Sequence, residues 1–184
     1  MTLDSAHLST PLKRTPLFAL HQKAQAKLVD FHGWEMPLHY GSQMEEHRAV
    51  RNNAGLFDVS HMTVIDITGK DAQAFLRFVL ANDVAKLTRN KGLYSVLLNH
   101  DAGIIDDLIA YDIDTDFYRL VTNSGTHPKV LNWLTTQKQL WVAQSKQEPH
   151  LEIHHQASLC ILALQGPKSE AIVEQAFKLS LPKT

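Results

Sequence analysis

The fold of this chain is decided between residues 94 and 123, where the sequence reads YSVLLNHDAGIIDDLIAYDIDTDFYRLVTN. Three runs that favour β-structure occupy this stretch, at residues 94–98, 104–112 and 117–123. Clusters of Asn, Asp, Thr and Gly separate the runs, and such clusters are typical of the turns that join antiparallel strands. We therefore expect three consecutive strands in an antiparallel meander.

The segments on either side of this meander predict one more strand and two helices. Residues 57–68 alternate in the period of a strand, and apolar residues then follow at helical spacing over residues 72–79. A second helical pattern spans residues 128–137. A sheet with helices on one face accommodates all of these patterns, so we predict an α+β unit over residues 57–137, with an antiparallel or mixed sheet.

The first segment of the chain contains two signals for the start of a helix. Thr15, followed by a proline, predicts a helix that ends near Lys27. Ser42 and Glu45 form a capping box, in which each side chain can satisfy a free backbone amide, and Gly55 offers a stop for this second helix.

The remaining segments, residues 1–56 and 138–184, are interpreted as parts of a first, incomplete unit. Within the second of them, residues 138–149 are predicted to be a polar connector. A short strand over residues 151–154 and a last helix over residues 169–178 complete the expected elements.

Composition and charge exclude several classes of protein. The 18 Lys and Arg residues nearly balance the 19 Asp and Glu residues, so no overall positive field exists to hold nucleic acid or an anionic membrane. No apolar stretch approaches the roughly 20 residues that a membrane-spanning helix needs, and the N-terminus lacks the pattern of a secretory signal. The single cysteine, Cys160, lies in an apolar run, where we expect a buried thiol. These features predict a cytoplasmic protein without nucleic-acid or membrane partners.

Two adjacent acids, Asp106 and Asp107, interrupt the apolar second strand of the meander. Strand geometry directs them to opposite faces, so at least one carboxylate lies against apolar surroundings. An ionised carboxylate is costly there unless hydrogen bonds or a positive partner hold it. We expect Asp107 to be this buried acid and Asp106 to lie on the other face.

The lengths of the two turns set the approximate register of the meander. This register places Asp107 opposite Thr122, next to Asn123, and near Ser95, next to Tyr94. An acid, an aromatic ring and an amide at one level of the sheet would suit a flat heterocycle that carries N–H groups. The alternative is that the acids cap a hairpin and bind water or backbone amides, and the residue types alone do not decide between the two.

Other kinds of site have weaker support. The chain contains 11 histidines, but no H-E-x-x-H motif and no cluster of Cys and His, so we expect no dedicated metal site. Ser60 and His61 are adjacent and diverge in a strand, which argues against a serine nucleophile. Neither of the two glycine-rich phosphate-binding motifs is present.

Four motifs together resemble one family. They are Asp30-Phe31-His32-Gly33-Trp34-Glu35-Met36-Pro37, Phe57-Asp58-Val59-Ser60-His61-Met62, Gly103-Ile104-Ile105-Asp106-Asp107-Leu108 and Leu164-Gln165-Gly166-Pro167. In order and spacing they closely resemble the T protein of the glycine cleavage system, an aminomethyltransferase, from about Thr15 to the last helix. The resemblance implies the folate-binding fold of that family.

The resemblance also implies an activity and a site. The family transfers a one-carbon unit from the aminomethyl-loaded dihydrolipoyl arm of the H protein to tetrahydrofolate, releasing ammonia and forming 5,10-methylenetetrahydrofolate. By matching position, Asp107 resembles the catalytic acid near N10 of the folate. Met62, Tyr94 and Asn123 match positions that line the folate pocket.

The sequence departs from the family in two places. Ala102 stands in a turn where the family often has paired glycines, and the family continues well beyond Thr184. We therefore expect the N-terminal half of such an enzyme, with the C-terminal half absent, and keep a non-catalytic folate-binding or interaction module of the same fold as the alternative. Iron-sulfur maturation proteins and demethylases share the fold, but His32-Gly33-Trp34 and the motif at residues 57–62 favour the glycine cleavage member.

Overall fold

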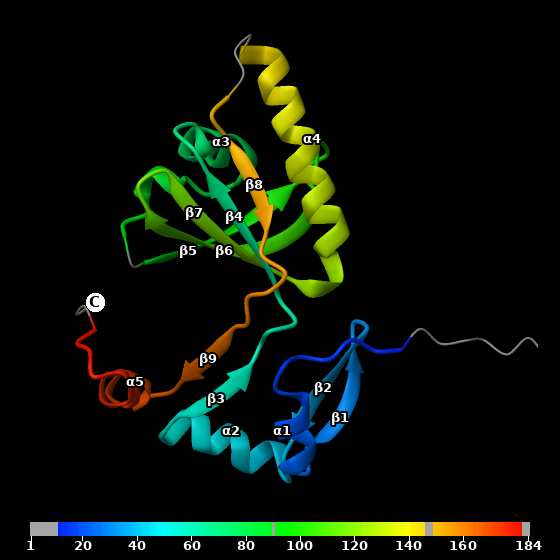
Figure 1. Cartoon of the computed structure of the whole chain (residues 1–184), viewed down its shortest axis with the longest axis vertical. Coiled ribbons are helices and arrows are strands. Elements are labelled where there is room, and N and C mark those ends of the chain that lie inside the picture. Colours follow the sequence, from blue (N-terminus) through cyan, green and yellow to red (C-terminus); the bar gives the residue numbers. More distant parts are fainter. Residues whose placement is uncertain (1–10, 90, 146–148, 182–184) are drawn as a thin grey trace, which may run out of the picture. The chain divides into compact units, whose positions relative to one another are not determined.

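The computed structural model describes residues 11–89, 91–145 and 149–181, and the chain divides into two units (Figure 1). Unit 1 consists of Met1–His61 and Cys160–Thr184, and unit 2 is the continuous segment Met62–Leu159. Unit 2 begins later than the expected strand-rich unit over residues 57–137, because residues 55–58 pair with residues 162–165 in unit 1, and it ends later, because residues 152–155 return to pair with residues 63–68.

A five-stranded antiparallel sheet forms the frame of unit 2. Its strands, in chain order, are β4 (Thr63–Thr68), β5 (Gly92–Leu98), β6 (Ile104–Asp114), β7 (Phe117–Thr122) and β8 (Glu152–His155). Across the sheet the order is β5-β6-β7-β4-β8. The predicted meander is therefore confirmed, and β4 and β8 extend it at the β7 edge.

Two helices, α3 (Ala72–Val79) and α4 (His127–Ser145), cover one face of this sheet (Figure 1). The apolar stripe of α3 and two buried apolar residues of α4 pack on the inward-facing side chains of the strands. The fully buried large side chains include Phe75, Leu76, Val130 and Leu134 from the helices and Ile65, Ile67, Leu97 and Leu120 from the sheet. Short 3-10 helices, η1 (Val84–Lys86) and η2 (Ser124–Thr126), precede β5 and α4. The open face of the sheet is left to carry polar groups.

The open face holds one buried ion pair between neighbouring strands. Asp66 of β4 lies opposite Arg119 of β7, and the guanidinium donates hydrogen bonds of 2.7 and 2.9 Å to the two carboxylate oxygens. This two-pronged contact offsets the cost of burying the Asp66 carboxylate in β4, an inner strand of the sheet.

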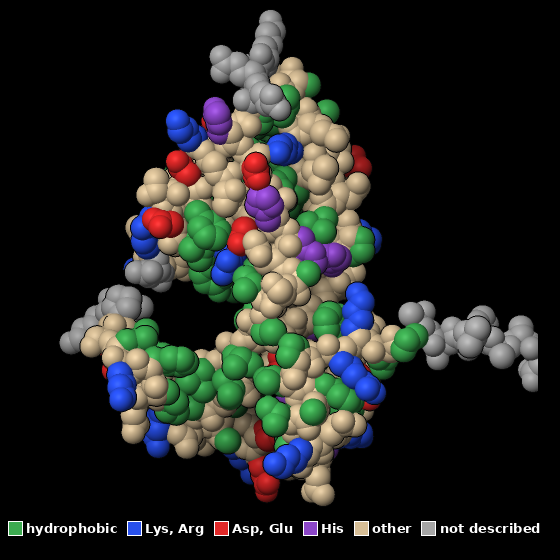
Figure 2. Space-filling view, in the orientation of Figure 1, with side chains coloured by type: hydrophobic (Ala, Val, Ile, Leu, Met, Phe, Trp, Pro, Cys, Tyr) green, Lys and Arg blue, Asp and Glu red, His purple; other side chains and the backbone are tan. Residues whose placement is uncertain are grey.

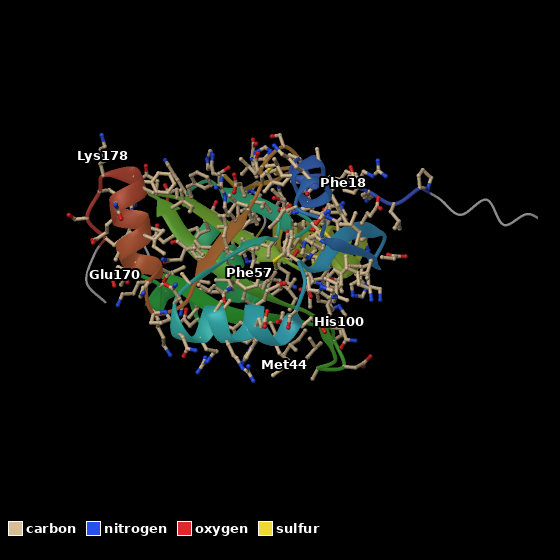
Figure 3. The ribbon with its side chains drawn as sticks, turned by 90° about the horizontal axis from the view of Figure 1, so that it is seen from below. Phe18, Met44, Phe57, His100, Glu170 and Lys178 are labelled. Atoms are coloured by element: carbon tan, nitrogen blue, oxygen red, sulfur yellow. The ribbon has the colours of Figure 1, made fainter. Side chains whose placement is uncertain are left out.

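The described part of unit 1, residues 11–61 and 160–181, combines two small sheets with three helices. A hairpin joins β1 (Lys27–Phe31) to β2 (Trp34–His39), and β3 (Gly55–Asp58) pairs antiparallel with β9 (Leu162–Gln165). The helices are α1 (Phe18–Lys23), α2 (Gln43–Asn52) and α5 (Ser169–Phe177). Figure 3 shows Glu170 in the first turn of α5 and Lys178 at its other end.

Several sequence predictions need correction. The first helix starts after Leu17 rather than at Thr15, and it ends at Lys23 because the chain turns into the β1–β2 hairpin that the sequence patterns did not predict. Residues 138–145, expected in a polar connector, continue α4, since this stretch contains good helix formers and no proline or glycine. Cys160 is exposed rather than buried, because it lies just before the short β9 and not within a long apolar strand.

Other local predictions are confirmed. Ser42 caps α2 by accepting a hydrogen bond from the Glu45 backbone amide at 3.3 Å, although the helix ends at Asn52 and Gly55, the expected stop, begins β3 instead. The turn between β5 and β6 is held by Asn99, whose side-chain oxygen accepts from the backbone amides of Asp101 and Gly103. Ala102 in this turn has φ of 60°, a left-handed conformation that glycine adopts more readily. Among the described helices, none is both long and apolar enough to cross a bilayer.

Candidate functional site

The structure brings three of the four predicted site residues into one hydrogen-bonded group on unit 2. The Tyr94 hydroxyl donates to Oδ2 of Asp107 at 3.0 Å, and the Asn123 side-chain amide donates to Oδ1 of the same carboxylate at 2.8 Å. Tyr94, Asp107 and Asn123 come from β5, β6 and the residue after β7. Both oxygens of Asp107 therefore have one donor each and keep further capacity to accept.

The register that produces this group is one residue from the predicted one. Asp107 pairs with Val96, and Leu108 pairs with Thr122. Tyr94 is then a diagonal neighbour of Asp107 on the same face, and Asn123 continues the β7 ladder beside it. A tyrosine and an amide reach the acid across neighbouring strands, as the meander predicted.

The expectation that Asp107 is the buried acid is wrong. Asp106 is only 5% exposed, whereas Asp107 is exposed, because Asp106 shares the helix-covered face with Leu108 and Ala110. Strand alternation then directs Asp107 to the open face. Its carboxylate is accessible to a ligand and is fixed by hydrogen bonds rather than by burial.

Asn123 connects the two acids. Its Nδ2 donates to Oδ1 of Asp106 at 2.7 Å as well as to Asp107, and its backbone amide donates to Oδ2 of Asp106 at 3.0 Å. We call this arrangement the Asn123 bridge. The sequence alone placed Asp106 on the opposite face but gave no signal that it contacts Asn123.

Met62, the fourth predicted residue, lies directly before β4 and is partly buried. Because Thr63 pairs with Thr122, continuing the ladder by one residue brings Met62 to the level of Asn123. Met62 therefore lies at the same end of the sheet as the Asn123 bridge, although no hydrogen bond ties it to the group.

The hydrogen bond between Tyr94 and Asp107 changes the acidity of the phenol. Donation to the carboxylate raises the pKa of Tyr94 above its usual value near 10, with smaller contributions from burial and from the negative charge of Asp107. Tyr94 thus stays protonated and continues to donate to the acid.

Unit 1 contains a second polar cluster that sequence patterns missed. Nδ1 of His21 forms a hydrogen bond of 2.7 Å with the Tyr40 hydroxyl, and Nε2 of His21 forms one of 2.9 Å with Oδ2 of Asp58. The side chains of His21 and Asp58 are 8% and 1% exposed. Burial alone would raise the pKa of Asp58, but hydrogen bonds from neighbouring side chains and from the Ser60 backbone hold it below its usual value.

Tyr40 and Asp58 also line an apolar groove of about 500 Å³ in unit 1, between β1, β2, α2 and β3. His61 lies at this groove, and burial lowers its pKa despite the nearby charge of Asp58.

Exposed apolar residues of unit 1 also gather over β3, β9 and α5 (Figure 2), among them Leu56, Phe57, Leu162, Ile172 and Phe177.

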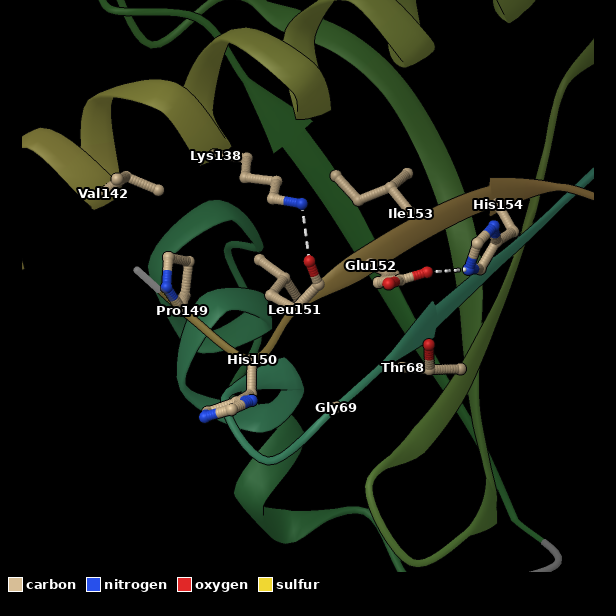
Figure 4. A pocket seen from close by; sticks show the side chains of 10 residues that line it. All are labelled: Thr68, Gly69, Lys138, Val142, Pro149, His150, Leu151, Glu152, Ile153 and His154. Carbon is tan, nitrogen blue, oxygen red and sulfur yellow. Dashed lines mark hydrogen bonds and ion pairs between the residues drawn. The ribbon is translucent and has the colours of Figure 1, made fainter. Parts of the chain in front are cut away.

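A separate cavity of about 630 Å³ in unit 2 contains none of the predicted site residues. It lies between α4, β8 and the turn after β4, and Figure 4 shows Lys138 donating to the Leu151 carbonyl and Glu152 paired with His154 inside it. Its charged groups are therefore already engaged with one another or with the backbone.

Within residues 11–89, 91–145 and 149–181, no cluster of three or more His, Cys, Asp or Glu side chains is arranged to hold a metal ion.

Comparison with known proteins gives consistent matches. A family model described as "GCVT N-terminal domain" matches residues 17–183. An aminomethyltransferase from Francisella philomiragia subsp. philomiragia is 49% identical over 161 residues, which are 88% of this chain and 43% of that protein. The crystal structure of glycine cleavage system aminomethyltransferase T from Bartonella henselae superposes with a TM-score of 0.81 at 37% identity, over 94% of this chain and 45% of that one. The chain spans less than half the length of either relative.

Proposed function

This chain belongs to the family of the GCVT N-terminal domain, the aminomethyltransferases of the glycine cleavage system, and from that premise we propose that its Asp107 serves folate-dependent aminomethyl transfer. The proposed donor is the aminomethyl group on the dihydrolipoyl arm of the H protein. The acceptor is tetrahydrofolate, and the products are ammonia and 5,10-methylenetetrahydrofolate.

One observation carries the proposal. The Asp107 carboxylate lies on the open face of the sheet, held by Tyr94 and Asn123 but accessible to a ligand. A fixed acceptor of this kind can orient an N–H group and take up its proton as a new bond forms to the nitrogen. Tyr94 adds an exposed aromatic ring, 62% accessible, against which a flat pterin can stack.

The chemistry balances without a further reactant. The transferred methylene carbon loses its bonds to nitrogen and sulfur and gains bonds to N5 and N10 of the folate. Of the two N–H protons of the folate, one is released as part of the ammonia and the other ends on the dihydrolipoyl sulfur. In this proposal Asp107 accepts the N10 proton, since an arylamine nitrogen is a weak nucleophile and gains from a base within hydrogen-bond reach.

Met62 and Asn123 are proposed as further walls of the folate site, with Asn123 also holding Asp107 in place.

A cytoplasmic location accords with the exposed free thiol of Cys160, which persists most readily in a reducing compartment.

Calorimetric titration with tetrahydrofolate under anaerobic conditions tests the proposal directly. The wild-type chain is expected to bind, and Asp107→Asn is expected to weaken binding by about tenfold, since a hydrogen bond to a charged group contributes about 1.5 kcal/mol or more. Asp116→Asn is the matched control, because this exposed acid lies in the β6–β7 turn at the other end of the hairpin. Equal heats for wild type and Asp107→Asn would remove Asp107 from the site.

A second assay separates transfer from binding. Incubation with aminomethyl-loaded H protein and tetrahydrofolate is expected to release ammonia, and Asp107→Asn is expected to slow this release. Folate binding without ammonia release would instead identify a non-catalytic folate-binding module of the same fold.

A further inference from the structure

The buried carboxylate of Asp106 has no role in the proposed transfer, yet it makes the shortest contact of the Asn123 bridge. Its Oδ1 accepts from Nδ2 of Asn123 at 2.7 Å and its Oδ2 accepts from the Asn123 backbone amide at 3.0 Å. Both oxygens of one buried acid are thus directed at one residue.

The chemistry of these groups fixes how the Asn123 amide is turned. An ionised carboxylate can only accept, so the face of the amide that meets Asp106 and Asp107 has to be the NH2 group. One N–H then points to Asp106 and the other to Asp107, at 2.7 and 2.8 Å. The amide oxygen of Asn123 takes no part in these two contacts and keeps its capacity to accept a hydrogen bond.

Asp107 itself cannot impose this orientation with equal strength. It is exposed, so water competes for its hydrogen bonds, whereas Asp106 is 5% exposed and is shielded by the helices. A hydrogen bond to a buried charged group is the stronger of the two, and leaving Asp106 without its donors would be costly.

We propose that Asp106 is a positioning residue, which orients Asn123 so that its N–H groups hold Asp107 and its oxygen faces the ligand. Asp106 touches no ligand in this scheme and acts only through Asn123. The inference rests on the proposed function for the role of Asp107, and it adds an acceptor, Oδ1 of Asn123, that can receive an N–H group of the pterin.

A double-mutant cycle on the whole chain tests this route. Asp106→Asn keeps the shape of the side chain but removes one acceptor, and it is expected to weaken tetrahydrofolate binding by about tenfold. In an Asn123→Ala background the same substitution is expected to have no further effect, because the route to Asp107 is already cut. Additive effects of the two substitutions, or unchanged binding by Asp106→Asn, would overturn the proposal.

The matched control is Asp71→Asn. Asp71 also accepts a backbone amide across a loop, from His150 at 2.9 Å, but it lies beyond the opposite end of β4. Folate binding by Asp71→Asn is expected to match that of wild type.

If Asp106→Asn does not fold, the cycle is run with Asp106→Glu instead. The Glu side chain retains the negative charge and moves the carboxylate oxygens by one methylene.

A readout without ligand keeps this inference separate from the proposed function. In the NMR spectrum of the chain, Asp106→Asn is expected to shift both side-chain amide protons of Asn123 and the Asp107 carboxyl carbon, while core methyl signals stay in place. If wild type fails to bind folate but these shifts occur, the proposed function fails and the positioning route stands. If the Asp107 signal does not move, the positioning route fails.

Discussion

At the scale of single residues, Tyr94 and Asp107 form the contact that is easiest to isolate. Tyr94 is exposed, so its acidity is governed mainly by the hydrogen bond that it donates to Oδ2 of Asp107. The pair therefore reports on the site in the absence of any ligand.

We predict that Asp107→Asn lowers the pKa of Tyr94 back toward its ordinary value near 10, because the substitution weakens the hydrogen bond that the phenol donates and removes the negative charge beside it. NMR titration of the tyrosine ring carbons measures this change. Tyr111 is the internal control, since burial alone raises its pKa and Asp107→Asn should leave it in place. A Tyr94 pKa that does not respond would mean that the hydrogen bond is not formed in solution.

At the scale of elements, the turn from β4 into α3 is fixed by a close backbone contact. Gly69 has φ of 111°, and a Cβ at this position would lie 1.9 Å from the carbonyl oxygen of His150. That oxygen belongs to the backbone just before β8, so it cannot rotate out of the way. The short β8 strand therefore depends on a glycine at the end of β4.

We predict that Gly69→Ala destabilises the chain by about 2 to 4 kcal/mol, through backbone strain and the loss of β8 docking. Gly41→Ala is the control, because Gly41 also has positive φ but has open space where the Cβ would lie. Its cost is the strain alone, about 1 kcal/mol. Denaturant unfolding followed by tryptophan fluorescence compares the two, and equal losses would contradict the steric explanation.

At the scale of the whole molecule, burial is concentrated in unit 2. Every residue of the main hydrophobic core lies between Ile65 and Ile153, while unit 1 buries few large side chains, such as Phe18 and Met36. Unit 2 is also one continuous segment of the chain. These two properties are what a segment needs in order to fold independently.

We predict that a fragment of residues 62–159 folds alone and retains slow hydrogen exchange in β4, β6 and β7. In the whole chain, amides of β3 and β9 are expected to exchange faster, since few buried contacts protect that pair of strands. Exchange measured by mass spectrometry on the chain and the fragment tests both statements. A fragment without protected amides would show that the core of unit 2 needs the rest of the chain.

The sequence by itself determined the meander, helix α3, the N-terminal cap of α2 and the meeting of Tyr94, Asp107 and Asn123, because strand period and turn length act over short distances along the chain. It did not predict the β1–β2 hairpin, whose two-residue turn is His32-Gly33 rather than the Asn-Gly or Asp-Gly pair that most strongly marks such turns. It also did not predict the full length of α4.

Only the tertiary structure decided which of the two acids is buried. Alternation requires Asp106 and Asp107 to face opposite sides, but which side is covered depends on where α3 and α4 pack. That packing joins residues far apart in the chain, and so do the pairing of β4 with β8 and the buried His21–Asp58 contact. Local patterns carry no information about such contacts until the chain has folded.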